Sequence, residues 1–268
     1  MRNKLFTLKI VLIPALIAAG FLFPLITRNP YHLHVLINIF IWCILALGIR
    51  IILVAGHLNA AQASFMGIGA YASALLAMKL GWSFWIALPA AGLISAFLAV
   101  LVGFPTLRIK GAYFVMVTFA ITEVCRQVWM MWKDLFGGVE GLLGIPRPAP
   151  IGLMGMMISF NSKVPFYYLA FLLFLFTVLV CHRLDKSHFG LTLRAFPQAE
   201  LLAECSGINV IRHKVIAFVI SSFFAGIAGS LSAHYFTYAS PWDFTWTNSL
   251  YMLLYTVIGG VSSVTGPI

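Results

Sequence analysis

Seven stretches of this 268-residue chain contain no Lys, Arg, Asp or Glu, and each is at least 18 residues long. A helix needs about 20 mainly apolar residues to cross the hydrocarbon core of a bilayer. Spanning strands are shorter and alternate in polarity, so uninterrupted apolar stretches favour helices. The stretches are residues 10–27, 31–49, 51–78, 80–107, 164–181, 215–242 and 244–268. This pattern predicts an all-α integral membrane protein.

The composition supports the same class. The chain is 62% hydrophobic and 9% charged, with a mean hydropathy of +0.99, whereas soluble domains carry about 25% charged residues. Residues 111–132 resemble the apolar stretches apart from Glu123 and Arg126 and add an eighth segment. We predict one domain, residues 1–268, built as a polytopic helical bundle with some discontinuous segments. The eight membrane segments are expected at about 8–27, 32–53, 59–78, 83–104, 112–132, 165–183, 215–237 and 248–268.

The basic residues set the expected orientation. With the N-terminus in the cytoplasm, 11 of the 17 Lys and Arg residues fall inside and 5 fall outside, while Arg126 lies within a segment. An excess of Lys and Arg in cytoplasmic loops is typical of membrane proteins, so we expect a cytoplasmic N-terminus. The net charge of +10 sits at helix ends and in short loops. This placement argues against nucleic-acid binding.

A polar segment, residues 182–214, separates two of the apolar stretches and holds 8 of the 24 charged residues. Pro197 suits the start of a helix, and Ala199, Leu202 and Ala203 would share one face of it. Gly207 is typical of a helix C-terminus. Such a helix either docks in a groove of a soluble partner or lies solvated on lipid headgroups.

Residues 55–64 place polar and glycine positions between apolar stretches, so a break in the helix is expected there. Irregular backbone at membrane depth is tolerated only inside protein or beside a water-filled cavity. The alternative is a short cytoplasmic turn. The candidates for a helix break or translocation path are Asn59, Gln62, Ser64, Gly67 and Gly69.

Glu123 is the one acidic residue inside a predicted segment, and Arg126 follows three positions later on the same helix face. An intramembrane carboxylate can mark a functional site. Our interpretation is a structural ion pair that faces the bundle interior. No spacing of histidines with a third ligand indicates a metal site.

Several sequence blocks together resemble the permeases of bacterial branched-chain amino acid ABC transporters, and in particular the M-type subunit of that system. Each block is weak alone, but their combined spacing, from about residue 40 to the end, is specific. The blocks are residues 67–71 (GIGAY), 111–114 (GAYF), 190–195 (GLTLRA), 204–210 (ECSGINV), 217–229 (AFVISSFFAGIAG), and 240–246 (SPWDFTW) with Gly259-Gly260. Family members continue beyond Gly266-Pro267, so we expect either a truncated sequence or a short member.

The resemblance implies that residues 184–214 form a cytoplasmic coupling loop whose helix docks on an ATPase subunit. Carried over by position, Arg194, Glu200, Glu204 and Gly207 would be its polar contacts and cap. Members usually have a more charged stretch where this chain has Phe196-Pro197-Gln198, so a less electrostatic contact is expected. The implied location is the bacterial inner membrane. The implied partners are a companion permease, two ABC ATPases, a periplasmic or extracellular binding protein and the lipid bilayer.

The chain has no Gly-x-x-x-x-Gly-Lys-Ser/Thr sequence, so ATP hydrolysis is expected in separate subunits, and neither an enzyme activity nor a cofactor is expected of this chain. The resemblance implies import of branched-chain amino acids, with urea or short-chain amides as the alternative. An ion-coupled secondary carrier would be expected to have more ionisable residues at mid-membrane. An intramembrane enzyme would need catalytic motifs that this sequence lacks.

Overall fold

The computed structural model describes residues 20, 21, 23, 24, 29–109, 111–153, 156–158, 160, 162–261, 263, 266 and 267. Most of the first predicted segment, 8–27, lies outside these residues, and its described positions 20, 21, 23 and 24 are helical. The other seven segments each correspond to one helix: α2 (Pro30–Val54), α3 (Gln62–Lys79), α4 (Phe84–Thr106), α5 (Ala112–Met131), α7 (Lys163–Lys186), α9 (Val210–Phe236) and α10 (Trp246–Gly259).

Local sequence signals set where several helices begin. The Asn29 side chain accepts a hydrogen bond from the amide of Tyr31 (3.1 Å) and precedes Pro30, so α2 starts with a capped first turn. Asn209 caps α9 in the same way through the amide of Arg212 (3.0 Å). α9 therefore begins five positions before the predicted start at 215, because hydropathy marks the apolar part of a helix rather than its polar end.

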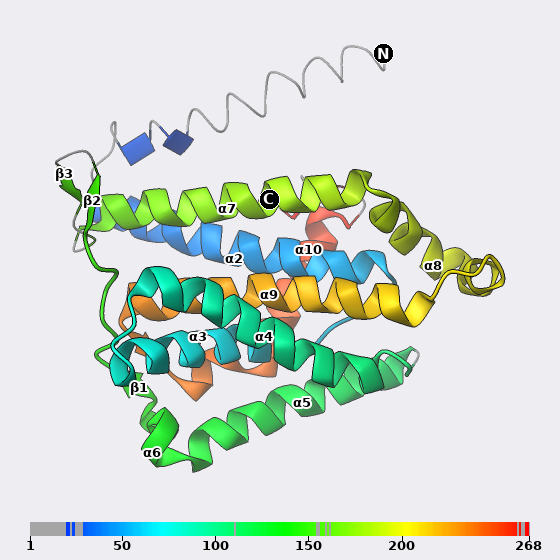
Figure 1. Cartoon of the computed structure of the whole chain (residues 1–268), viewed down its shortest axis with the longest axis horizontal. Helices are drawn as coiled ribbons and strands as arrows, with labels where there is room; N and C mark the ends of the chain where they lie inside the picture. Colours follow the sequence, from blue (N-terminus) through cyan, green and yellow to red (C-terminus); the bar gives the residue numbers. More distant parts are fainter. Residues whose placement is uncertain are drawn as a thin grey trace.

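α9 lies at the centre of the bundle and packs against α2, α3 and α4 (Figure 1). Two glycines allow this close approach. A Cβ atom at Gly226 would lie 2.7 Å from the Cβ of Ser95 in α4, and one at Gly229 would lie 3.0 Å from the backbone nitrogen of Ala70 in α3. Small residues at helix crossings let backbones approach in this way, so the small-residue spacing in α9 is a packing feature.

Five of the described helices are long and apolar enough to cross a membrane, namely α2, α4, α5, α7 and α9. α10 has 14 residues, or about 21 Å at 1.5 Å per residue, which is less than the hydrocarbon core of roughly 30 Å. α3 has 18 residues and starts with polar Gln62 and Ser64. The all-α membrane class is therefore confirmed, while α3 and α10 are shorter than the other segments.

The two ends of the bundle carry different structures (Figure 1). One end carries α8 (His188–Cys205). The opposite end carries the Gly/Pro-rich connection between α5 and α7. Its β1 (Leu142–Leu143) pairs antiparallel with β4 (Tyr238–Ala239), and β2 (Ile151–Leu153) pairs with β3 (Met156–Ile158). The remaining short helices are α6 (Lys133–Phe136), η1 (Gly138–Glu140) and η2 (Pro241–Phe244).

Candidate functional site

The chain leaves helical geometry between α2 and α3, as the sequence predicts. α2 ends when the amide of Gly56 donates to the carbonyl of Leu53 (2.9 Å) and the amide of His57 donates to Ile52 (3.3 Å). This is a Schellman motif, and Gly56 takes the left-handed conformation that it requires (φ 84°). Residues 55–61 then run as irregular backbone to the start of α3. We refer to residues 55–61 as the α2–α3 connection.

A buried hydrogen-bond network joins the α2–α3 connection to α3 and α9. Asn59 accepts from the amide of Ala61 (2.9 Å) and donates to the side-chain oxygen of Gln62 (3.2 Å). The Ser221 hydroxyl in α9 donates to the same oxygen (3.1 Å), and Gln62 donates back to the carbonyl of Ser221 (3.4 Å). All three side chains are fully buried. The amides are thus satisfied by one another and by α9.

Hydroxyl groups from two further helices satisfy the irregular backbone and the first turn of α3. In α5, Thr118 accepts from the amide of Ala60 (3.2 Å), and Thr122 donates to the Ala60 carbonyl (3.0 Å). In α10, Ser249 accepts from the amide of Ala63 (2.9 Å). These contacts enclose residues 59–61 within the bundle, whereas Gly56 and Leu58 of the same connection are exposed.

The five residues predicted at the break fall into two groups. Asn59, Gln62 and Ser64 are fully buried polar residues around the break, and the Ser64 hydroxyl donates to the carbonyl of Ala61 (2.7 Å). Gly67 and Gly69 lie further along α3 at packing contacts. A Cβ atom at Gly67 would lie 2.8 Å from the Phe244 ring, and one at Gly69 would meet the backbone of Gly226. The glycines therefore permit close packing.

α8 differs from the helix expected after Pro197. It begins at His188, where Ser187 accepts from the amide of Gly190 (3.2 Å), and continues through Pro197 to Cys205. At Ala199 the backbone is not helical (φ −147°, ψ 49°), so two helical pieces meet at a kink. The expectation of a helix that starts at Pro197 was wrong, because proline also terminates or kinks a preceding helix.

Two ion-pair systems hold α8 against the bundle. At the end of α7, Asp185 accepts from the two terminal nitrogens of Arg50 in α2 (3.2 and 2.7 Å) and from Arg194 in α8 (2.9 Å). The Arg50 side chain is 0% exposed, and its Nε also donates to the carbonyl of Val261 (2.9 Å). Near the kink, Lys214 in α9 pairs with Glu200 (3.0 Å). Arg194 and Glu200 thus bind within the chain.

The second piece of α8 presents apolar side chains to solvent. Leu201 is 72% exposed and Leu202 is 70% exposed, whereas Ala203 is buried. The expected single face of Ala199, Leu202 and Ala203 is therefore divided, since Leu202 is exposed and Ala203 is buried. Glu204 is also exposed. Gly207 ends this piece in a Schellman motif (φ 80°). The amide of Gly207 donates a hydrogen bond to the carbonyl of Glu204, and the amide of Ile208 donates one to the carbonyl of Ala203. This confirms the predicted cap.

Glu123 and Arg126 form the predicted ion pair, but it is not enclosed. Arg126 Nε lies 3.1 and 3.0 Å from the two carboxylate oxygens of Glu123, and the guanidinium lies 5.1 Å from the Trp242 ring centroid. The Glu123 side chain remains 33% exposed and that of Arg126 15%. The pair therefore lies at the edge of the bundle, which corrects the interpretation that it faces the interior.

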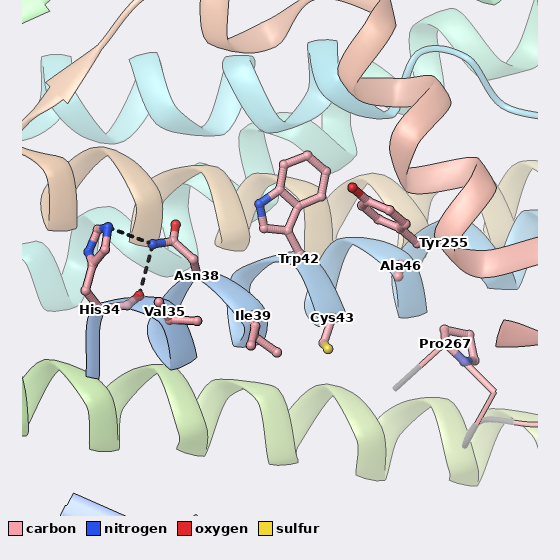
Figure 2. A pocket seen from close by; sticks show the side chains of 9 residues that line it. All are labelled: His34, Val35, Asn38, Ile39, Trp42, Cys43, Ala46, Tyr255 and Pro267. Atoms are coloured by element: carbon pink, nitrogen blue, oxygen red, sulfur yellow. Dashed lines mark hydrogen bonds between the residues drawn. The ribbon is translucent and has the colours of Figure 1, made fainter. Parts of the chain in front are cut away.

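A groove of about 440 Å³ runs along the exposed side of α2 (Figure 2). Its polar side chains follow helical spacing, with His34, Asn38 and Trp42 four positions apart, and Asn38 donates to the carbonyl of His34 (3.0 Å). Trp42 meets Tyr255 of α10 edge-on, with ring centroids 5.8 Å apart. Sequence reasoning missed this groove, although the i, i+4, i+8 spacing of these three residues was a readable signal.

Within the described part of the chain, no group of three or more His, Cys, Asp or Glu side chains is arranged to hold a metal ion. The chemistry available here is hydrogen bonding by buried amides and hydroxyls, together with ion pairs at one end of the bundle.

Comparison with known proteins gives a consistent result. The family described as branched-chain amino acid transport system / permease component matches residues 31–268. Two curated relatives, from Salmonella typhimurium and Escherichia coli, are each named high-affinity branched-chain amino acid transport system permease protein LivM. Both are 34% identical over 242 residues, which cover 83% of this chain and 57% of each relative. The chain thus matches little more than half the length of these relatives, and no solved structure matches it.

Proposed function

The chain belongs to the family of permease components of branched-chain amino acid transport systems, and from this premise we propose that it is the transmembrane permease subunit of an ABC importer. Its proposed substrates are branched-chain, hydrophobic amino acids, and its proposed location is the bacterial inner membrane. The five long apolar helices and the two LivM relatives support this assignment.

The proposed partners follow from what such a transport system needs. Two cytoplasmic ABC ATPases would hydrolyse ATP, a companion permease would complete the membrane part, and a binding protein outside the membrane would deliver the amino acid. Since the sequence carries no phosphate-binding loop, this chain itself is proposed to move substrate without hydrolysing ATP.

We propose about eight membrane segments with a cytoplasmic N-terminus and a cytoplasmic α8. The opposite placement of α8 and the α5–α7 connection supports this (Figure 1), as does the 11-to-5 excess of basic residues on the proposed inner side. A thiol reagent that does not cross membranes tests the orientation. A cysteine introduced by Ser187→Cys should react only from the cytoplasm, and one introduced by Leu143→Cys only from outside. Reversed labelling would overturn the topology.

We propose that α8 is the coupling helix, within the loop of residues 184–214. The observation that carries this is the exposure of Leu201 and Leu202 on the second piece of α8, which Lys214–Glu200 holds against the bundle, while Asp185–Arg194 holds the first piece. Exposed leucines on a fixed helix suit insertion into an apolar groove of a partner. Glu204 would add a polar contact beside them, and Gly207 would fix the end of the helix.

Charged substitutions test this docking surface. Leu201→Asp together with Leu202→Asp should leave the amount of chain in the membrane unchanged but abolish co-purification of the ATPases and uptake of leucine. Leu143→Asp is the matched control, since Leu143 is 65% exposed at the opposite end of the bundle. Intact ATPase co-purification with the double variant would contradict the assignment. Uptake of urea or a short amide in place of leucine by the unaltered transporter would replace the proposed substrate.

We further propose that the translocation path passes beside the α2–α3 connection. Asn59, Gln62 and Ser221 are polar groups enclosed at the middle of the bundle, and breaks in membrane helices commonly lie where substrate crosses. Alternating access would then require this connection to change shape. Gln62→Leu should reduce uptake more than ATP hydrolysis, and equal losses of both would contradict a role in the path.

A further inference from the structure

The α2–α3 connection touches the kink of α8. At Gly56, the left-handed glycine that ends α2, a Cβ atom would lie 3.3 Å from Cγ and 3.5 Å from Cβ of Pro197. At these distances an added Cβ would be in tight van der Waals contact, so the Pro197 ring packs against Gly56 with little room for a side chain there. Pro197 precedes the non-helical Ala199 by two positions. α8 therefore packs against the end of α2 close to its own kink.

A second link joins the same two elements through one carboxylate. Asp185 binds Arg50, four positions before the end of α2, and also Arg194, three positions before Pro197. Arg50 is fully buried and Asp185 is 18% exposed, whereas Arg194 is 44% exposed, so the bond to α2 is shielded from solvent and the bond to α8 is partly exposed. Shielded ion pairs with several hydrogen bonds hold geometry more firmly than exposed ones. Asp185 therefore joins α8 to the last turns of α2 through a single carboxylate.

Beyond Gly56 the chain leads directly into the buried network. Asn59 lies three positions after Gly56. Its side-chain amide donates a hydrogen bond to the side-chain oxygen of Gln62, which also accepts one from the Ser221 hydroxyl of α9. α8 has another link to the bundle, Lys214–Glu200, but this joins it to α9, the helix that follows it in the chain. A straight helix such as α9 resists deformation, whereas irregular backbone absorbs changes in φ and ψ. The α2–α3 connection is the more deformable of the two neighbours.

We infer that Gly56 and Pro197 form the contact through which α8 moves the α2–α3 connection and, with it, Asn59 and Gln62. Asp185 is a positioning residue in this linkage, because it holds α8 and the end of α2 at one carboxylate. The inference rests on the proposed role of α8 as the coupling helix and adds the route by which its movement reaches the bundle. In this account, a chain with the contact immobilised hydrolyses ATP but transports poorly.

A disulfide across the contact tests this in the purified, reconstituted transporter. The 3.5 Å between the position of a Cβ at residue 56 and the Cβ of Pro197 falls within the range that disulfides need, about 3.5–4.5 Å. Gly56→Cys with Pro197→Cys would be made in a Cys205→Ser background, since Cys205 is the exposed native cysteine among the described residues. Oxidation should lower leucine uptake per ATP hydrolysed by about fivefold or more, the lower end for coupled sites. Reduction should restore it.

The outcomes separate the inference from the function. Failure of the disulfide to form, or its formation with unchanged uptake per ATP, would overturn the proposed contact. The two single-cysteine variants should be insensitive to oxidation. If the unaltered transporter shows no ATP-dependent leucine uptake, the proposed function fails instead.

A pair of glycine substitutions gives a second test without cross-linking. Gly56→Ala places a methyl group against Pro197, whereas Gly81→Ala imposes comparable backbone strain (φ 65°) at a position with no atom within 4 Å. We expect Gly56→Ala to lower uptake per ATP by about fivefold or more and Gly81→Ala to leave that ratio unchanged. Equal ratios for the two variants would contradict the linkage, even if both lower the amount of folded chain.

Discussion

Two ion pairs within apolar helices of this chain differ in how far the protein encloses them. Arg50 and Asp185 are 135 positions apart and come together with the Arg50 side chain 0% exposed. Glu123 and Arg126 are three positions apart on one helix, and the Glu123 side chain remains 33% exposed. Only Glu123 and Arg126 both lie in a segment that the sequence assigns to the membrane, since Asp185 falls in the predicted cytoplasmic loop, 184–214. The comparison teaches that enclosure by other helices, rather than position in an apolar stretch, decides how much a charge depends on its partner.

The surroundings of the two helices explain the difference. α2 packs against α7, α9 and α10, while α5 lies at the edge of the bundle (Figure 1). Of the most apolar 18-residue stretch of α2, 72% of the residues are buried, compared with 22% for the corresponding stretch of α5. A charge on α2 therefore meets protein on most sides. A charge on α5 meets protein on fewer sides.

The largest expected effect comes from breaking the enclosed pair. Asp185→Asn leaves Arg50 buried without its carboxylate, and removing one partner of a buried pair costs about 3–5 kcal/mol. The amount of monodisperse protein in detergent and its thermal unfolding midpoint should both fall. Adding Arg50→Met should recover part of the loss, since it removes the unpaired charge. An unchanged midpoint for Asp185→Asn would contradict the strong dependence of Arg50 on this carboxylate.

A much smaller effect is expected at the edge pair. Because Glu123 is partly exposed, Glu123→Gln should cost about 0–1 kcal/mol in detergent, as for exposed pairs, and should barely move the unfolding midpoint. Glu123→Gln with Arg126→Gln should match the single variant. If Glu123→Gln instead unfolds the protein as readily as Asp185→Asn, the contrast between the two pairs fails. Normal folding with lost transport would show that Glu123 has a functional role.

Much of the fold could be predicted because charge marks the limits of membrane helices. The predicted segment 32–53 corresponds to Pro30–Val54, and 83–104 to Phe84–Thr106. Gly207 was predictable as a cap because a left-handed residue after a helix favours glycine. The segment 248–268 was too long, since α10 ends at Gly259 and Gly260 has a φ of 100°.

The contacts of the candidate site were less predictable, because they depend on residues far apart in sequence. Arg50 was counted as one more cytoplasmic charge, although it lies inside α2 and binds Asp185. A signal was present, since Asp185 is the one acidic residue of α7 and lies at the same end of the bundle as Arg50. The kink at Ala199 and the contact of Pro197 with Gly56 follow from how α8 packs on the bundle, which local propensity does not encode.

The most direct measurement is leucine uptake by proteoliposomes that hold the transporter purified through a tag on this chain, together with its binding protein. The account predicts radiolabelled leucine uptake that requires ATP on the side of α8 and continues when a proton uncoupler is added. Uptake that ignores ATP and stops with the uncoupler would contradict it and indicate an ion-coupled carrier.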